Sequence, residues 1–345
     1  METNGIDVIS PERSKPVPGF SVIIPVKAIN SYLEESIPII LGLDYEAFEV
    51  IILPNESPAG QLPTWGADPI VSIVPTGQVS PAVKRDIGAE TARYDHLAFL
   101  DDDAYPQADW LRRAEQAFRD TGAAAIGGPG VTPPNAPLFE QASGLFFETK
   151  IGGGGMDYRY RPGTNTFRVD DYPTVNFLIQ KNAFFAVGGF DNAYWPGEDT
   201  KLCLDLVKAG YAIWYCPDVV VFHHRRPTLL RHLAQVGNYG RHRGHFARIL
   251  PETSARPAYF VPSLFLIGTI GLVALGFVSP VFWRMYAVLM LIYFFLAAVD
   301  VFGRTRNLAV GILTILTIFC SHLVYGFMFL QGLLTWQAFR SVLRS

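Results

Sequence analysis

Three long apolar runs in the last quarter of the chain limit its possible folds more than any other feature. They span Tyr259–Val278, Met285–Val299 with Val281–Trp283 just ahead, and Leu308 to about Leu334. An apolar helix of about 20 residues matches the roughly 30 Å hydrocarbon core of a bilayer. The alternative is a set of buried helices in a large soluble core, but three successive runs leave too little polar surface to cover them. The sequence therefore predicts a transmembrane region of three helices at 257–336, followed by a C-terminal tail at 337–345.

Basic residues near these runs predict how the chain is oriented. Segment 223–250 contains six arginines and no acidic residue, and Arg304 and Arg306 lie between the second and third runs. The positive-inside rule places both regions in the cytoplasm. The polar N-terminal segment lacks the apolar core of a signal peptide. We therefore expect a multi-pass protein of the plasma (inner) membrane with a cytoplasmic catalytic domain. Three crossings place the C-terminus outside, but Arg340 and Arg344 favour the inside, so both locations stay open.

The residues before the apolar runs alternate between strand and helix patterns. SVIIPV at 21–26 and FEVIILP at 48–54 are short β-branched runs that end near proline, and DHLAFL at 95–100 is a third. The stretch after Pro81 repeats Val83, Ile87 and Ala92 at helical spacing. This βαβ order predicts an α/β domain with a mostly parallel sheet, whose ligands bind beyond the carboxyl ends of the strands.

The segment FLDDDAYP at 99–106 places three aspartates at such a strand end. Adjacent carboxylates repel one another unless a cation or a set of donors balances them. Oxygen ligands suit a hard divalent ion such as Mg²⁺ or Mn²⁺, which keeps open positions for phosphate oxygens. The alternative is a solvated acidic turn, because aspartate followed by proline is common in turns.

A second acidic element begins a predicted helix about a hundred residues later. Glu198 and Asp199 follow a Trp-Pro-Gly turn. One of these carboxylates could remove a proton from a substrate hydroxyl as a general base. The alternative is that both acids only stabilise the helix N-terminus.

The segment 227–256 reads as an amphipathic interfacial segment. Leu229, Leu230, Leu233 and Val236 are expected to share one helical face, which would rest in the membrane interface. Its arginines could bind the phosphates of a lipid-linked diphosphate, or the segment could be a charged linker that only obeys the topology. The net charge of −3 favours no nucleic-acid partner.

Five motifs, in order along the chain, resemble those of family 2 glycosyltransferases with the GT-A fold. They are SVIIPV, EVIILPNES, PAVKRDIGAETARYDHLAFLDDDAYP, VNFLIQKNAFFAVGGFD and GEDTKLCLDL. The resemblance covers about Phe20 to Arg226, and membrane spans after the catalytic domain are common in that family. It implies an N-terminal tail at 1–19 and a GT-A (Rossmann-like) catalytic domain at 20–226 that binds a nucleotide-sugar, followed by the all-α transmembrane region.

The resemblance also implies roles for individual residues. Asp101 would lie near the nucleotide ribose, and Asp103 would bind a divalent metal (Mn²⁺ or Mg²⁺) that bridges the diphosphate. Asp199 would be the catalytic base, positioned by Glu198, and His223 a further metal ligand, with His224 as its rival. Trp195 and Asn176 would lie on the acceptor side. The implied nucleotide-sugar-binding residues are Pro25, Lys27, Asn55, Arg85, Asp86, Asp101 and Asp102, with Asp101 also counted among the metal ligands.

Two departures from the family pattern limit what the resemblance implies. Pro54 and Asn55 stand where relatives usually have an acidic pair, so the base of the nucleotide is not assigned. The stretch QVGNY that begins at Gln235 lacks the Trp of the Q-x-x-R-W motif of processive synthases, which favours a single sugar addition.

The resemblance implies an inverting enzyme, and together with the acidic strand end and the apolar runs it predicts a metal-dependent, membrane-anchored enzyme of polysaccharide biosynthesis. It would move one sugar to a lipid-linked or membrane-proximal glycan acceptor, with membrane lipid as a further partner. The alternatives are a polyprenyl-phosphate glycosyltransferase and a non-catalytic membrane protein that binds a nucleotide-sugar.

Overall fold

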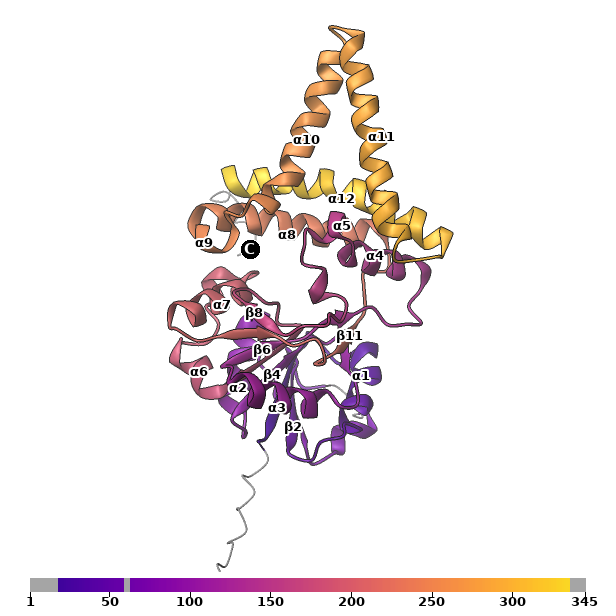
Figure 1. Ribbon diagram of the computed structural model, residues 1–345. Coiled ribbons are helices and arrows are strands. Elements are labelled where there is room, and N and C mark those ends of the chain that lie inside the picture. Colours follow the sequence, from indigo (N-terminus) through magenta and orange to yellow (C-terminus); the bar gives the residue numbers. More distant parts are fainter. Residues whose placement is uncertain (1–17, 59–62, 336–345) are drawn as a thin grey trace, which may run out of the picture.

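The computed structural model describes residues 18–58 and 63–335 (Figure 1). An α/β domain occupies one end of the molecule, and a hairpin of two long helices projects from the other. The predicted 337–345 tail, residues 1–17 of the predicted 1–19 tail, and with them Arg340 and Arg344, lie outside the described residues.

Eight strands form the main sheet, in the order β3-β2-β1-β4-β9-β6-β10-β8. β1 pairs in parallel with β2 and β4, whereas β9 is antiparallel to both of its neighbours, β4 and β6. The α/β prediction is confirmed, and the sheet is mostly parallel but mixed, because β8 and β9 run against the other strands. The strands are β1 Phe20–Pro25, β2 Phe48–Leu53, β3 Val71–Ile73, β4 His96–Leu100, β6 Ala125–Gly127, β8 Phe167–Val169, β9 Asn176–Gln180 and β10 Ile213–Tyr215.

The apolar runs of β1 and β2 are buried on both faces of the sheet. Alternate residues of each strand belong to two separate core clusters: Val22 and Ile24 pack on one side, and Ile23 packs on the other. Helices α1 (Ser31–Leu41) and α3 (Trp110–Thr121) contribute to the first cluster, and α2 (Pro81–Thr91), α6 (Lys181–Ala186) and α7 (Glu198–Lys208) to the second. Because both faces are covered, these strands need continuous apolar sequence rather than an alternating pattern.

A smaller sheet lies at the carboxyl edge of the main one. Its order is β5 (Ala104–Pro106), β11 (Val221–His223) and β7 (Gly130–Val131). β11 runs antiparallel to β5, and in this register His223 lies opposite Ala104. The pairing brings together two segments that are more than a hundred residues apart in the sequence.

The remaining helices form the other end of the molecule, next to this edge, and include the projecting hairpin (Figure 1). They are α4 Leu138–Glu148, α5 Lys150–Gly153, α8 Leu229–Ile249, α9 Pro251–Ser254, α10 Pro257–Gly276, α11 Pro280–Phe302 and α12 Leu308–Thr335. Short 3₁₀ turns occur at η1 Thr64–Ala67, η2 Asp157–Arg159 and η3 Asn192–Tyr194.

Three helices among the described residues are long and apolar enough to cross a membrane, as the sequence predicts. They are α10, α11 and Leu308–Leu334 of α12. α10 and α11 form the projecting hairpin, whereas α12 runs across its foot beside α8 (Figure 1). The predicted apolar face of α8 is split: Val236 is buried in a cluster with residues of α4 and α12, whereas Leu230 is 79% exposed.

Candidate active site

The edge of the main sheet gathers three potential metal ligands. Asp101 and Asp103 follow the last residue of β4, and the pairing of β11 with β5 places His223 beside them. Ligand atoms of Asp101, Asp103 and His223 all lie within 4.8 Å of one another. Two carboxylates and an imidazole are compatible with a divalent ion such as Mn²⁺. The structure thus brings together the three residues that the sequence predicts as metal ligands.

Two neighbouring side chains keep Asp103 ionised. Its Oδ1 lies 3.0 Å from His223 Nε2, and its Oδ2 lies 3.5 Å from a guanidinium nitrogen of Arg226. Burial alone would raise the pKa of Asp103, but His223 and Arg226 outweigh it and lower the pKa to about 2.

The two adjacent histidines have different surroundings. Arg225 donates a 3.0 Å hydrogen bond to His223 Nδ1, so that Nε2 carries the ring proton and faces Asp103. A divalent cation held by His223 would replace that proton. His224 instead forms a 2.9 Å contact with Glu35 and lies outside the group of ligands.

Asp102, the middle aspartate, belongs to a different contact. It accepts a 2.6 Å hydrogen bond from Asn30, the residue that caps α1. Burial raises the pKa of Asp102, and the negative charge of Asp103 raises it further. Asp101 and Asp103 therefore belong to the metal-ligand group, whereas Asp102 binds the residue that caps α1.

Arg85 links the metal-ligand group to the second acidic element. This buried side chain of α2 donates to Asp101 Oδ1 at 2.8 Å and to Glu198 Oε1 at 3.0 Å. Its neighbour Asp86 accepts a 2.9 Å hydrogen bond from the backbone N–H of Phe190, and burial raises the pKa of Asp86 to about 6. Arg85 thus holds Asp101 and Glu198 at a fixed separation, and Asp86 holds the Gly-Gly-Phe loop.

Asp199 has the electrostatic properties of a general base. Burial and the negative charges of Glu198 and Asp171 raise the pKa of Asp199 to about 7. A carboxyl with this pKa is part ionised at neutral pH and can accept a proton there.

Gly197, just before α7, has a φ of +151°, and a Cβ at that position would lie 2.7 Å from Phe246 Cζ of α8. The chain therefore needs glycine where α8 packs against the start of α7.

A buried lysine that the sequence analysis did not single out organises the loops after β1 and β2. Lys84 Nζ donates to the carbonyls of Val26 (2.6 Å) and Leu53 (3.0 Å) and to Asn55 Oδ1 (2.6 Å). Burial lowers the pKa of Lys84. Pro25 ends β1 at the start of the first loop, and Lys27 in that loop is exposed. These loops, which hold three of the predicted nucleotide-binding residues, are therefore tied to α2.

The two residues expected on the acceptor side lie in different places. Trp195 is 40% exposed and lines the large cavity described below. Asn176 is fully buried, where its Oδ1 accepts from Trp110 Nε1 and its Nδ2 donates to the carbonyl of Val219. Asn176 is therefore a core residue, and it is not among the residues that line the large cavity.

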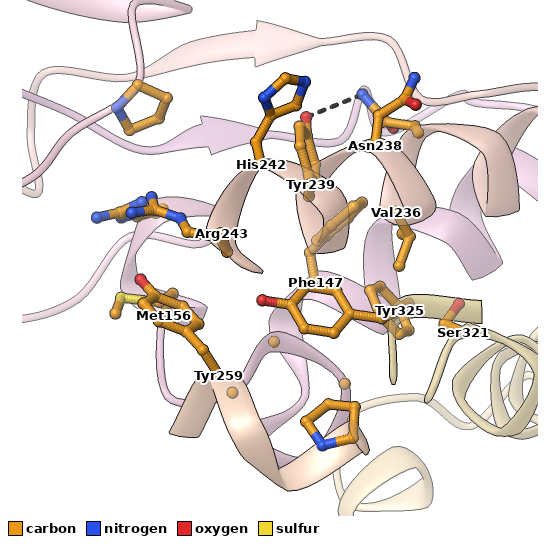
Figure 2. A pocket seen from close by; sticks show the side chains of 18 of the residues that line it. Phe147, Met156, Val236, Asn238, Tyr239, His242, Arg243, Tyr259, Ser321 and Tyr325 are labelled. Carbon is orange, nitrogen blue, oxygen red and sulfur yellow. Dashed lines mark hydrogen bonds between the residues drawn. The ribbon is translucent and has the colours of Figure 1, made fainter. Parts of the chain in front are cut away.

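A cavity of about 1340 Å³ joins the catalytic edge to the helical region. At one end it is lined by Asp101, Glu198 and Asp199. Figure 2 shows aromatic side chains along it, including Phe147 and Tyr239, with Tyr259 from α10. Its far end is lined by residues of the hairpin: Val261, Pro262, Phe265, Tyr293 and Leu296. One continuous space therefore connects the carboxylates to the apolar helices.

Comparisons with known proteins identify the family and the fold of this chain. The family model described as "Glycosyl transferase family group 2" matches residues 96–329. The pre-mycofactocin glycosyltransferase of Mycobacterium tuberculosis is 29% identical over 161 residues, which are 46% of this chain and 33% of that protein. The chain thus spans only about a third of that relative. Glycosyltransferase AglE of Haloferax volcanii is 27% identical over 238 residues, 64% of this chain and 72% of that protein.

A solved structure shows the same fold. The mannosyltransferase PcManGT from Pyrobaculum calidifontis, solved with GDP-Man and Mn²⁺, aligns over 92% of this chain and 87% of its own, with a TM-score of 0.54 and 16% identity. The domain therefore has the GT-A fold that the sequence predicts. The family model covers well over half of the residues, and the chain belongs to the family 2 glycosyltransferases.

Proposed function

We propose that this protein is an inverting, metal-dependent glycosyltransferase that moves one sugar from a nucleotide-sugar to a hydroxyl of a lipid-linked or membrane-proximal glycan. The observation that supports it is the cavity that runs from Asp199 to α10 and α11. An acceptor held partly in a membrane can reach the carboxylates through this space. The catalytic domain would lie on the cytoplasmic side of the plasma membrane.

The carboxylates at the cavity's end divide the chemistry between them. Asp199 removes the proton from the acceptor hydroxyl as that oxygen attacks the anomeric carbon, because its pKa of about 7 leaves it part ionised at neutral pH. Glu198, paired with Arg85 at 3.0 Å, orients the start of α7. A single base and an in-line attack invert the anomeric carbon.

Asp101, Asp103 and His223 would hold the divalent ion, which supplies positive charge that stabilises the departing nucleoside diphosphate. Arg85 holds Asp101 from the side of α2, and Arg226 supports Asp103 from the chain after β11. The loops tied by Lys84 lie at the ends of β1 and β2, where the nucleotide would bind.

A polyprenyl-phosphate acceptor is the second candidate, with a phosphate oxygen as the nucleophile. Lys150 and Arg231 line the same cavity, and within residues 18–58 and 63–335 neither side chain forms an ion pair. These two cations are suited to a phosphate. A phosphate is already ionised at neutral pH and needs no strong base. Asp199→Asn therefore separates the two candidates, because it removes activity toward a hydroxyl and leaves activity toward a phosphate.

Turnover of a donor panel tests the proposal directly. Detergent-solubilised protein is incubated with UDP, GDP and dTDP sugars in Mn²⁺, Mg²⁺ or chelator, and sugar release or transfer is measured. We expect one nucleotide class to turn over in a metal-dependent way and Asp103→Ala to abolish it. Asp44→Ala, which changes an exposed aspartate whose side chain is 71% accessible, is the matched control and keeps full activity. Binding of a donor without turnover in any metal would instead identify a non-catalytic nucleotide-sugar-binding protein.

A further inference from the structure

The third apolar helix differs from the other two in how it packs. Of the candidate span in α12, 39% is buried inside the protein, against 6% for α10 and 11% for α11. Figure 1 shows α12 running along α8 and crossing the foot of the hairpin, where Ser263 of α10 donates a 3.0 Å hydrogen bond to the carbonyl of Gly326, instead of running parallel to α10 and α11. Its apolar sequence is therefore partly explained by contact with protein.

Glycines bring the backbones of α8 and α12 into direct contact. A Cβ at Gly240 would lie 2.7 Å from the carbonyl oxygen of Tyr325, and a Cβ at Gly244 would lie 2.1 Å from that of Phe329. On α12, a Cβ at Gly332 would lie 1.9 Å from the carbonyl oxygen of Arg241. Residue numbers at these contacts increase in the same direction along both helices, so the two helices run parallel. Their backbones lie so close that only glycine fits at the contact points.

Hydrogen bonds along this contact hold the two helices in register. His232 Nε2 of α8 lies 3.1 Å from Ser321 Oγ, and Arg241 Nε donates to Gln331 Oε1 at 3.0 Å. α12 also reaches the α/β domain, where Thr314 Oγ1 donates to the carbonyl of Ala142 in α4 at 3.3 Å. α12 is therefore attached along most of its length.

α8, the partner of α12, is itself bound to the α/β domain and carries many ionisable side chains. Arg243 donates to Asp171 of that domain at 2.6 Å. The helix also contains Arg231, Arg241, Arg248, His232, His242 and His245. If α12 crossed the bilayer, it would carry this helix into the hydrocarbon, where arginine is strongly disfavoured.

The two sides of α12 have different surroundings. At 100° per residue, its exposed apolar side chains fall within an arc of about 100°; they are Leu308, Ile312, Leu316, Phe327 and Leu334. The buried residues occupy the opposite side and include Val310, Thr314, Thr317, Ser321 and Phe329. One side of the helix is thus fitted to protein. The other carries an apolar strip that the foot of the hairpin interrupts, where Phe319 packs against Phe265 and Gly326 against Pro262.

From these contacts we propose that α10 and α11 alone cross the bilayer, and that α8 and α12 lie together along the membrane surface next to the catalytic domain. The apolar strip of α12 would contact the acyl chains of the nearer leaflet. α10 and α11, at about 30 and 35 Å from 20 and 23 residues, match the hydrocarbon core.

Charge at the ends of the hairpin agrees with two crossings. Arg256, Arg304 and Arg306 all lie at its foot, and Asp300 there accepts a 3.0 Å hydrogen bond from the backbone of Ile151 in α5. The turn at its tip, 277–279, is uncharged, and near this end the hairpin carries one basic residue, Arg284, against three at the foot. With two crossings, the C-terminal Arg340 and Arg344 also fall on the basic side, in agreement with the positive-inside rule.

Depth measurements with spin labels test the orientation of α12. Cysteines replace Ile312 and Phe327, which are 56% and 59% exposed on the same side of the helix, in a Cys320→Ser background. We expect equal depths for the two nitroxides in lipid vesicles, whereas a crossing helix separates them by about 22 Å. Leu264→Cys and Leu275→Cys in α10 are the matched pair and should differ by about 16 Å. A large difference within α12 would overturn the proposal.

Side-specific labelling tests the topology independently. Glu46→Cys in the catalytic domain, Val278→Cys at the hairpin tip and Ser345→Cys are each treated with a membrane-impermeant maleimide in sealed vesicles. We expect Ser345→Cys to react whenever Glu46→Cys reacts, and Val278→Cys to react only after permeabilisation of those vesicles. If Ser345→Cys needs permeabilisation while Glu46→Cys does not, the two-crossing arrangement is wrong. Neither experiment depends on enzymatic activity.

Discussion

Arg243 of α8 donates a 2.6 Å hydrogen bond to Asp171, a buried carboxylate of the α/β domain. The other oxygen of Asp171 accepts a 3.0 Å hydrogen bond from Thr200, which follows the proposed base. Arg243 also lies 4.9 Å from the ring centroid of Tyr259 in α10. α8, which contacts α10, and the proposed base are therefore joined through one carboxylate.

Replacing Asp171 with asparagine should destabilise the protein strongly. Burial alone would raise the pKa of Asp171, but Arg243 and Arg159 hold it well below its usual range, so the carboxylate is charged. Its removal leaves two buried guanidiniums without their counterion, which we expect to cost about 3–5 kcal/mol. Thermal unfolding in detergent measures this loss. The control is Asp170→Asn, because its partner Arg256 and its own side chain are both solvent-accessible and such pairs contribute at most about 1 kcal/mol. Equal effects of the two variants would contradict a structural role for the buried group.

The pH dependence of transfer should follow the ionisation of Asp199. Because its pKa is about 7, the basic form is scarce below that pH and dominates above it. We expect kcat/KM to rise with pH through about 7 and then to level off. Asp199→Asn should reduce the rate by about 10²–10⁴-fold and remove this rise. A rate that is constant between pH 5.5 and 8.5 would exclude Asp199 as the base.

Replacing Glu198 with glutamine should shift this pH profile toward acid. After burial, the negative charge of Glu198 is the largest cause that raises the pKa of Asp199, so its loss lowers that pKa. The midpoint of the kcat/KM profile of Glu198→Gln is the quantity to compare with the unsubstituted protein. A midpoint that is unchanged or higher would show that the two carboxylates are not electrostatically coupled.

The two adjacent histidines should differ in their effect on metal binding. His223→Ala removes a side chain that lies within the group of potential ligands, and His224→Ala removes one that contacts Glu35 instead. We expect His223→Ala to weaken Mn²⁺ binding at least tenfold, since even the loss of a group that only supports a metal ligand costs about 10–100-fold. Free Mn²⁺ measured by electron paramagnetic resonance reports affinity without any substrate. Equal affinities in both variants would remove His223 from the site.

Two lysines near the predicted nucleotide loops should separate stability from donor binding. Lys84→Met leaves two backbone carbonyls and Asn55 without their buried donor, and we expect it to lower the free energy of unfolding by about 1–3 kcal/mol. Lys27 is exposed, and we expect Lys27→Met to raise the KM for the donor at an unchanged unfolding temperature. The opposite pattern would reverse the roles of the two side chains.

Much of the architecture could be predicted because its signals are local. The β-branched runs at 21–26 and 48–54 became β1 and β2, and each of the three apolar runs became a helix long enough to span a membrane. Asp101 and Asp103 could be predicted as neighbours because a strand end places consecutive residues together. The mixed direction of the sheet could not, because a strand's direction depends on which strands it lies between.

Other features depend on which distant segments meet. The pairing of β11 with β5 puts the side chain of His223, the last residue of β11, beside that of Asp103, whereas the side chain of His224 contacts Glu35. Asn176 belongs to a family-like motif and was expected on the acceptor side. In the structure it is buried and forms hydrogen bonds with Trp110 and Val219. The role of Lys84 could not be predicted, because in the sequence it looks like any lysine on a helix. Its partners come from the ends of two separate strands.

By itself, the sequence determined the apolar helices, the acidic strand end and the likeness to glycosyltransferases, because length, hydropathy and short motifs are properties of contiguous residues. Only the tertiary structure decided that Asp171 joins α8 to the proposed base, that one cavity reaches from Asp199 to α10 and α11, and that α12 packs along α8. Each of these depends on contacts between segments far apart in the chain. The physical reason is that hydropathy does not distinguish a surface that will meet lipid from one that will meet another helix.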